Sequence, residues 1–175
     1  MSATQCTSRS RPDPLPIAAQ LAAAHGPSAQ PEALLVTLGT TLQQALGHIL
    51  FTVLVFDGAA GQMRRIFSTR PDINPVGGSK PITDSDWMRQ VLHRGQPYIG
   101  RSRNDLKYAF FDYEQLWAIG CESVLNMPVL WAGRVLGSLN LLHGAGWYDE
   151  QDLATAQIFA QLALPALLPP GPATN

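Results

Sequence analysis

The chain has 175 residues, a length typical of one domain, and 12 basic against 13 acidic side chains give it a net charge of −1. This balance disfavours nucleic-acid binding, because a protein that follows a phosphate backbone needs a basic excess. Hydrophobic residues make up 46% of the chain and charged residues 14%, a composition that excludes a disordered polyelectrolyte.

The sequence also bounds the location of the protein. No run of about 18 consecutive apolar residues occurs, so we expect no membrane span and no membrane partner. The first thirty residues lack the basic start and compact apolar run of a secretion signal. The two cysteines, Cys6 and Cys121, are too few for a disulfide scaffold or a tetrahedral zinc site. We therefore expect a cytoplasmic protein without a metal or cofactor.

Prolines mark the ends of the expected domain. Four of the fourteen prolines lie in residues 1–30 and four more in residues 165–175, and such segments are poor candidates for independent folding. We therefore divide the chain into an N-terminal Pro/Ala-rich extension to residue 30, a single domain over 31–168 and a tail over 169–175. The Ala-rich segment 17–24 can still form a short helix that docks on the domain.

The first half of the domain predicts a helix and two strands. Leucines at helical spacing, with a proline at the start and a glycine after the end, predict a helix over residues 31–46. A β-rich run over 49–56 predicts a buried strand, and residues 62–68 return as its partner after an Asp-Gly turn. We interpret 69–81, which is rich in Pro and Gly, as a loop. Its Gly-Gly-Ser-Lys segment, 77–80, has the character of a flexible connector rather than a phosphate loop.

The second half adds two helices, a short strand, a hairpin and a closing helix. We expect a helix capped by Thr83 or Asp84, a strand over 97–99, a polar loop to residue 110, a helix over 111–119, a hairpin of 122–131 and 134–143 with an Ala-Gly turn, and a helix that begins at Asp149. The predicted order is therefore α-β-β-α-β-α-β-β-α.

The segment from Ser123 to Leu167 has a recognisable pattern. A strand with Pro128-Val129 is followed by a short turn and a Gly-x-Leu-x-Leu strand, and then by Trp147-Tyr148, Glu150-Gln-Asp152 and a long helix. This pattern and the element order resemble the GAF domain family. The resemblance implies an α+β fold: an antiparallel sheet of five to six strands, with the terminal helices on one face and short helices and loops over a pocket on the other. Other α+β sensor folds, such as PAS or roadblock-like domains, are the alternatives.

Strand alternation identifies candidate pocket residues. Side chains alternate between the two faces of a strand, so Val124 shares a face with Asn126, and Ser138 with Asn140. The resemblance places Val124, Asn126 and Asn140 on the pocket side. The two buried amides must be satisfied by a polar ligand, by each other or by ordered water. Aromatic residues of the covering segments complete the expected ligand-binding set: Trp87, Tyr98, Tyr108 and Trp117.

Basic residues also lie in the covering loop. Arg101, Arg103 and Lys107 can meet an anionic ligand, although a solvated loop is the favoured interpretation. The resemblance implies small-molecule binding or dimeric signalling, usually without catalysis. We therefore expect a non-catalytic sensory domain that binds an unknown small molecule and acts in signal transduction. The two tails are too short for an output domain, so we expect the signal to pass to an unidentified output protein. The alternative is a dimerisation or interaction module with a collapsed pocket.

The sequence contains no catalytic motif that we recognise. A nucleophile elbow, a phosphate loop and a dinucleotide fingerprint are missing, and the four histidines lack metal-ligand spacing. One branch of the family reduces free methionine sulfoxide with cysteines. The resemblance puts the critical groups of that branch at Trp117, Val124, Asn140 and Leu142, where this chain lacks the required side chains. We interpret Cys121 as a small buried hydrophobe and expect no enzyme, with a reductase as the remaining alternative.

The terminal helices predict a homodimer. The helix over 31–46 carries Leu34 beside its leucine stripe, and the closing helix is apolar around much of its circumference. A surface helix needs only about 100° of apolar arc, so the excess should be exposed in a monomer and should pair two copies. The competing interpretation is that residues 17–24 fold back over this surface within one chain.

Overall fold

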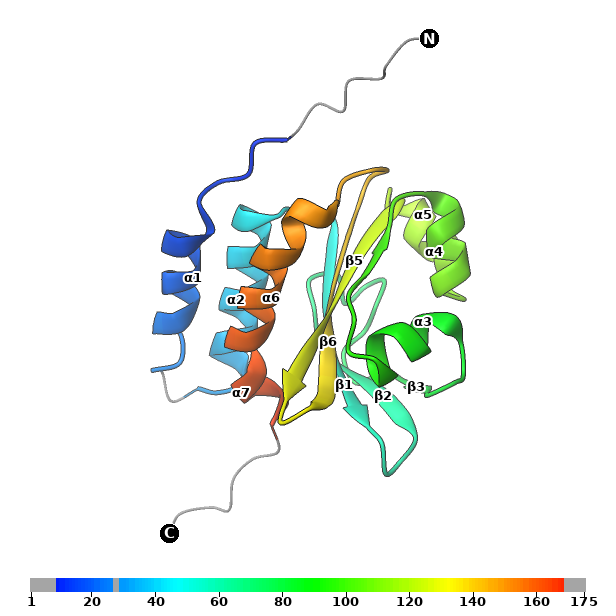
Figure 1. The fold of residues 1–175 in the computed structure, drawn as a ribbon, viewed down its shortest axis with the longest axis horizontal. Helices are drawn as coiled ribbons and strands as arrows, with labels where there is room; N and C mark the ends of the chain where they lie inside the picture. The colour runs from blue at the N-terminus through cyan, green and yellow to red at the C-terminus, as the bar shows by residue number, and fades with distance from the viewer. Residues whose placement is uncertain (1–8, 27–28, 169–175) are drawn as a thin grey trace.

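A six-stranded antiparallel sheet forms the centre of the structure, a computed structural model that describes residues 9–26 and 29–168 (Figure 1). Its strands are β1 (Leu50–Asp57), β2 (Gln62–Ser68), β3 (Ser79–Pro81), β4 (Tyr98–Gly100), β5 (Ser123–Trp131) and β6 (Arg134–His143). They lie in the order β3-β2-β1-β6-β5-β4, so that the first and last long strands are neighbours at the centre.

Helices cover both faces of this sheet. They are α1 (Pro14–Ala23), α2 (Glu32–Ala45), α3 (Asp86–Met88) with the π-helical turn η1 (Arg89–His93), α4 (Arg103–Ala109), α5 (Tyr113–Ala118), the 3₁₀ turn η2 (Glu150–Asp152), α6 (Leu153–Leu162) and α7 (Leu164–Leu167). In Figure 1, α2 and α6 lie on one face and α3, α4 and α5 on the other. The predicted α+β architecture, with terminal helices on one face and short helices on the other, is confirmed. No helix in the described part of the chain has the length and hydrophobicity to span a bilayer.

The two faces of the sheet bury different side chains. The main core lies under the terminal helices and includes Phe51, Leu125 and Leu141. Val124 and Leu142 belong to a separate cluster on the opposite face. Neighbours in sequence therefore point to opposite faces, as the predicted alternation along β5 and β6 requires.

The hairpin of β5 and β6 is the longest pairing in the sheet. Its turn falls at Ala132 and Gly133, as predicted, and both residues have left-handed backbone conformations, with φ of 49° and 73°. A two-residue turn of this kind matches the twist of antiparallel strands. The resulting register places Asn126 directly opposite Asn140.

Helix α1 packs on the outer surface of α2 and α6 (Figure 1). Ile17, Ala18 and Leu21 are buried in the main core, although they precede the expected start of the domain. The predicted short helix over 17–24 therefore forms, and it folds back over the terminal helices as the competing interpretation proposed. The homodimer stays a prediction, but α1 already covers part of the surface from which it was inferred.

Two further elements differ from the sequence prediction. The expected polar loop before residue 110 contains α4, which begins with a capping box between Ser102 and Asp105. The expected loop over 69–81 ends in the edge strand β3, in which Lys80 lies opposite Met63 of β2. Ser79 and Lys80 therefore belong to the sheet edge, and the backbones of Gly77 and Gly78 bond to Arg65, so the segment is not a free connector.

Candidate functional site

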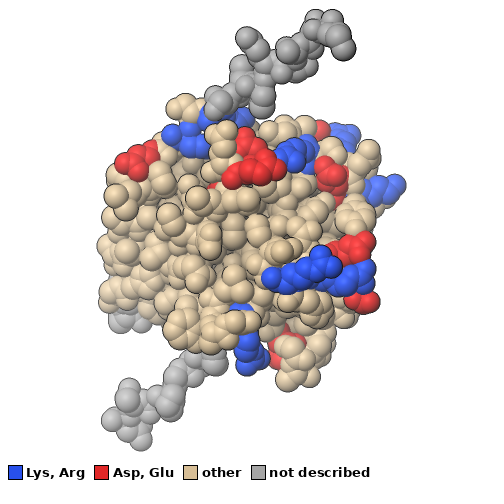
Figure 2. Space-filling view, viewed as in Figure 1, with Lys and Arg blue, Asp and Glu red and all other residues tan. Residues whose placement is uncertain are grey.

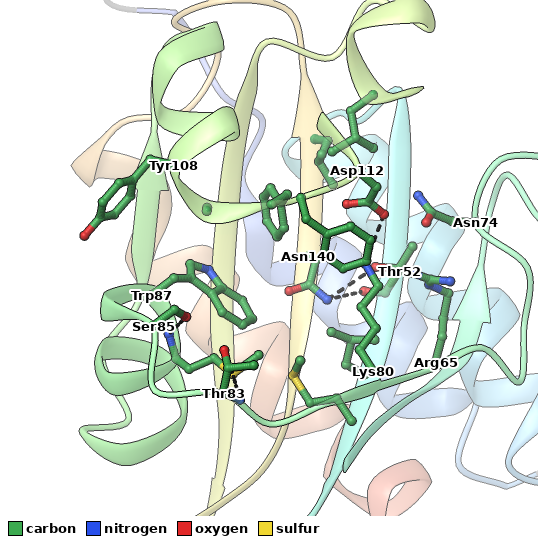
Figure 3. Close-up of a pocket in the computed structure, with 18 of the residues that line it drawn as sticks. Thr52, Arg65, Asn74, Lys80, Thr83, Ser85, Trp87, Tyr108, Asp112 and Asn140 are labelled. Atoms are coloured by element: carbon green, nitrogen blue, oxygen red, sulfur yellow. Dashed lines mark hydrogen bonds and ion pairs between the residues drawn. The ribbon is translucent and has the colours of Figure 1, made fainter. Parts of the chain in front are cut away.

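A cavity of about 440 Å³ lies between the sheet and the helices α3 to α5 (Figure 3). Its floor comes from β1, β2 and β6, its edge from β3 and the 69–81 segment, and its cover from α3, α4 and the start of α5. The apolar part of the lining includes Leu54, Met63, Trp87, Met88, Phe110 and Leu142. The covering segments place aromatic and thioether groups against the strands, which gives the cavity a mainly apolar wall.

A network of hydrogen bonds fixes the floor. The amide of Asn126 donates to Oδ1 of Asn140 at 2.7 Å, and the hydroxyl of Ser138 donates to the same oxygen at 3.0 Å. Asn140 in turn donates to Oγ1 of Thr52 at 3.3 Å. The indole of Trp87 donates to Oδ1 of Asn126 at 2.9 Å. The two predicted asparagines therefore hydrogen-bond to each other, which was one of the three alternatives for their side chains. Asn126 also accepts a hydrogen bond from Trp87 in the lid.

This network decides which predicted residues reach the cavity. Asn140 and Trp87 line it, and Tyr108 lines it from the cover. Asn126 is fully buried beneath Trp87, and Ser138 is fully buried behind Asn140, so neither belongs to the lining. The prediction that both asparagines line one pocket therefore holds for Asn140 but not for Asn126.

The other three predicted residues lie away from the cavity lining. Val124 is buried in the cluster beneath α4 and α5, and Trp117 packs at the edge of that cluster. The hydroxyl of Tyr98 donates to the carbonyl of Asp105 at 3.1 Å. Burial raises the pKa of Tyr98 to about 12, so the phenol stays a neutral donor that supports α4. These residues hold the lid in place but do not face the cavity.

Charged residues gather at the β3 side of the cavity, where the sequence predicted none. Lys80 and Asp112 form an ion pair at 3.0 Å, and Arg65 and Asn74 line the wall beside them (Figure 3). Arg65 is only 8% exposed. Burial lowers the pKa of its guanidinium from the ordinary value, and the charge of Asp112 partly opposes that shift.

The basic residues of the covering loop separate into two groups. Lys107 lines the cavity. Arg101 pairs with Glu150, and Arg103 pairs with Glu122 at 2.8 Å, so both point away from it. Of the three basic residues that the sequence suggested as contacts for an anionic ligand, only Lys107 lines the cavity.

A simple signal in β2 was missed. Side chains alternate along β2, so Met63 and Arg65 share one face. The neighbouring strand β1 is buried, which indicates that this face of the sheet is covered. Lys80 and Asp112 had no such signal. They meet because β3 pairs with β2 while the α5 end of the lid folds across it.

The cysteine in the described part of the chain does not reach the cavity. Cys121 lies outside the lining, fully buried in the cluster beneath α4 and α5, and burial raises its pKa to about 12. A thiol with that pKa is a poor nucleophile near neutral pH. Cys6 lies outside the described residues. In residues 9–26 and 29–168, no group of three or more His, Cys, Asp or Glu side chains is arranged to hold a metal ion.

Several solved structures share this fold. The GAF domain of an Acinetobacter phosphoenolpyruvate-protein phosphotransferase is similar over 95% of this chain and 94% of that chain, with a TM-score of 0.71 and 14% identity. The corresponding Coxiella burnetii domain is similar over 86% and 90%, with a TM-score of 0.69 and 18% identity. Free methionine-R-sulfoxide reductase from Neisseria meningitidis, solved with its substrate, is similar over 90% and 92%, with a TM-score of 0.63 and 14% identity.

At these identities the similarity shows the fold alone. A search of curated proteins found no match. The matches also include the GAF domain of a two-component sensor histidine kinase from Bacillus halodurans and part of a methyl-accepting chemotaxis protein. A sequence model described as the GAF domain matches residues 30–167, which is most of the chain. The chain therefore belongs to the GAF domain family.

Proposed function

We propose that this chain is a non-catalytic sensory domain that binds a small molecule in the cavity between the sheet and α3 to α5. The observation that carries the proposal is the cavity itself. Its volume of about 440 Å³ falls within the range of about 300–1,000 Å³ that is usual for small-molecule sites. Its lining has the usual character as well, because apolar and aromatic walls surround a few directed polar groups such as Asn140 and Thr52.

The fixed floor supports ligand binding over an interaction module with a collapsed pocket. Asn140 uses its side chain to bind Asn126, Ser138 and Thr52, so the strands beneath the cavity are held together without a ligand. A cavity with a rigid floor stays open when it is empty, which favours binding with little reorganisation. The burial of Cys121 supports a domain without reductase activity.

The mouth of the cavity offers a route for the signal. Tyr108 and Phe111 line the cavity and are 60% and 77% exposed. Large exposed aromatic groups are common anchors in protein interfaces. We infer that an output protein reads the position of α4 and α5 through these two side chains. The proposed location is the cytoplasm, which is supported by the free thiol of Cys121, the cysteine in the described part of the chain.

A second proposal concerns the helix layer on the opposite face. The helices α1, α2 and α6 contain one charged residue between them, Glu32. Figure 2 shows that few charged side chains lie over these helices in this view. Leu15, Val36 and Ile158 remain exposed on α1, α2 and α6. We propose that this surface joins two copies of the chain, with α1 as part of the interface rather than outside it.

Replacing Ala109 with Phe tests ligand binding. Ala109 ends α4 and lines the cavity, so a phenyl ring at this position fills ligand space. Ala145→Phe, in the exposed turn after β6, is the matched control, since it lies outside both the cavity lining and the helix layer. We expect compounds from a thermal-shift screen of small metabolites to stabilise the wild type and Ala145→Phe but not Ala109→Phe, with native mass spectrometry giving the bound mass. Equal stabilisation of all three proteins, or of none, contradicts the proposal.

A further inference from the structure

Arg65 is a buried cation without an anionic partner in the described residues. Its side chain extends from β2 into the wall of the cavity, where the residue is only 8% exposed (Figure 3). Nη1 donates to the carbonyl of Pro75 at 3.0 Å. Nε is buried and has no hydrogen-bond partner, and no carboxylate of the described chain lies within ion-pair distance of the guanidinium. Burying an unpaired charge is unfavourable, so this arrangement requires an explanation.

The backbone keeps Arg65 where it is. Its N–H donates to the carbonyl of Gly78 at 2.9 Å, and its carbonyl accepts from Gly77 at 2.8 Å. The strand is thus bonded along the β3 side, and on the other side it pairs with β1, where Arg65 lies opposite Leu54. The sheet therefore holds the Cα–Cβ bond of Arg65 on the cavity side of β2.

The nearby acidic group is already used. Asp112 forms the ion pair with Lys80 at 3.0 Å and is the only carboxylate among the described residues that line the cavity. The lining also holds Lys107 as a third cation. Positive charge therefore exceeds negative charge in the cavity, and the excess at the β3 end belongs to Arg65.

The remainder of the wall restricts what kind of anion fits. Next to the charged end lie Met63, Trp87, Met88 and Phe110, which offer thioether and aromatic surface. A small inorganic ion leaves this surface uncovered. A multiply charged ligand meets only one unpaired cation at the buried end of the cavity, because Lys107 is exposed on the cover. A planar guanidinium matches a carboxylate in geometry and charge. The polar amide of Asn74 lies in the same wall and can donate to a second oxygen.

We propose that the cavity binds a small organic monocarboxylate with an apolar or aromatic body, with its carboxylate at Arg65 and its body against Met63, Trp87 and Met88. This inference rests on the proposed function and names the ligand class of the same site. Arg65 is then retained for binding rather than for stability, because the ligand supplies the negative charge that the folded chain lacks.

Matched acids and amides test the ligand class. The probes are phenylacetate, indole-3-acetate and hexanoate, each beside its primary amide, which has nearly the same shape but no charge, and phenyl phosphate is added as a second anion. Dissociation constants are measured by titration calorimetry or ligand-observed NMR. We expect at least one acid to bind about ten- to a hundredfold more tightly than its amide, as the loss of a charge-assisted pair of hydrogen bonds implies.

Two variants separate the arginine from the cavity. Arg65→Met keeps the length of the side chain and removes the charge, and Arg64→Met makes the same change on the exposed, opposite face of β2. We expect Arg65→Met to bind the acids about ten- to a hundredfold more weakly and to bind the amides as the wild type does. We expect Arg64→Met to leave both unchanged.

The ligand-free protein provides a second readout. If Arg65 serves binding, Arg65→Met should melt at the same temperature as the wild type or higher, because an unpaired buried charge is removed. A melting temperature several degrees lower shows instead that the bond to Pro75 makes Arg65 a structural residue, and overturns the proposal.

The outcomes distinguish this inference from the proposed function. Equal binding of acid and amide, or unchanged acid binding by Arg65→Met, overturns the proposal that the ligand is a carboxylate held by Arg65. It leaves the proposal of a ligand-binding cavity standing. Tighter binding of phenyl phosphate than of every carboxylate overturns it in favour of a phosphate ester. Binding of no probe also overturns it, while the proposed function is decided separately by Ala109→Phe and its control.

Discussion

The indole of Trp87 donates a hydrogen bond to Oδ1 of Asn126 at 2.9 Å, and so attaches the lid to the sheet beneath it. Asn126 continues the connection by donating to Asn140 at 2.7 Å, and Asn140 is itself part of the cavity floor. The lid is therefore joined to the strands through Trp87 by side-chain hydrogen bonds. This chain of bonds makes the lid and the floor one unit, which a sensory role requires if the two are to respond together.

Trp87→Phe should loosen the lid. The change removes the indole donor and leaves Oδ1 of Asn126 buried without that partner, which we expect to lower the free energy of unfolding by on the order of 2 kcal/mol. Trp117→Phe is the matched control, because Nε1 of Trp117 is buried and has no hydrogen-bond partner in the structure. Urea unfolding should show a clearly smaller loss for Trp117→Phe, and equal losses would contradict a special role for the Trp87 bond.

Gly137→Ala should strongly destabilise the fold. A Cβ at Gly137 would lie 2.0 Å from the carbonyl oxygen of Leu54 and 2.5 Å from the Leu167 side chain. Since β6 lies between β1 and β5, the strands must separate to admit the methyl group. We expect a loss of about 3 kcal/mol or more in the free energy of unfolding.

Gly144→Ala is the control for that substitution. Apart from its chain neighbours, no residue that the structure describes has an atom within 4 Å of a Cβ built at Gly144, just after the same strand. Thermal unfolding should show a change of about 0.5 kcal/mol or less for this variant. If Gly137→Ala proves equally mild, the close approach of β6 to β1 is not what requires glycine at that position.

The thiol of Cys121 should be unreactive in the folded protein. The thiol is fully buried and burial raises its pKa to about 12, so a thiolate is rare near pH 7. We expect the wild-type protein to show no reduction of free methionine sulfoxide in a thiol-coupled assay. In a Cys6→Ser background, a thiol reagent should modify Cys121 only after unfolding. Reductase activity that disappears on Cys121→Ser would overturn this prediction.

His143 should make the fold sensitive to acid. The pKa of His143 is lowered to about 4, mainly by burial and secondly by the positive charge of Arg9. Nδ1 accepts a hydrogen bond from the N–H of Gly144 at 2.7 Å, and the ring stacks on Trp147, so the neutral ring is the form that fits. The unfolded chain, with a histidine pKa of about 6.5, then takes up the proton first as the pH falls.

The free energy of unfolding should therefore decrease as the pH falls from about 6.5 to about 4. The ring is only partly buried, so solvent screening reduces the contribution to about 1 to 2 kcal/mol. His143→Asn keeps an acceptor for Gly144 and removes the titration, so urea unfolding at pH 7 and pH 4.5 should show a smaller difference than in the wild type. His93→Asn, a change at an exposed histidine, should leave the difference unchanged. Identical pH dependence in all three proteins would contradict the assignment.

The elements that the sequence predicted are those with local signals. The leucine spacing of α2, the apolar run of β1 and the Ala-Gly turn of the last hairpin each lie within one segment, and each formed as predicted. Alternation grouped Val124 with Asn126 along β5 and Ser138 with Asn140 along β6, and the family resemblance put both asparagines on the pocket side. The structure pairs them directly opposite each other. These inferences need no knowledge of what packs against the segment.

The contents of the cavity could not be predicted in the same way. Trp87 reaches Asn126 across 39 residues of sequence, and that bond is what removes Asn126 from the lining. Lys80 meets Asp112 only because the segment after β2 returns as an edge strand instead of a loop. Alternation puts Arg65 on the face of Met63, but an arginine in a strand is usually solvent-exposed, and its contacts with Pro75 and Gly78 in the covering segment have no local signal.

The last prediction concerns α1 and the oligomeric state. The helix is anchored at both ends: before it, Arg11 pairs with the buried Asp152 at 2.8 Å, and after it, the His25 ring contacts the carbonyl of Leu162 at 2.9 Å. Between these anchors Leu21 is fully buried in the main core. Removing residues 1–28 should expose the apolar surface of α2 and α6 that α1 covers, so the shortened chain should self-associate.

Sedimentation velocity at micromolar concentration separates the cover from the dimer interface. If the helix layer joins two copies, the full chain should sediment as a species of twice the 18.9 kDa mass of one chain. A single species of 18.9 kDa would contradict the dimer.

A matched pair of substitutions on α1 refines the test. Leu21→Glu should detach the helix and give the self-association of the shortened chain, because Leu21 is fully buried. Leu15→Glu, at a side chain that is 74% exposed, should leave α1 in place and dissociate a dimer built on its outer surface. If the shortened chain stays monomeric, α1 is not the cover that its burial indicates.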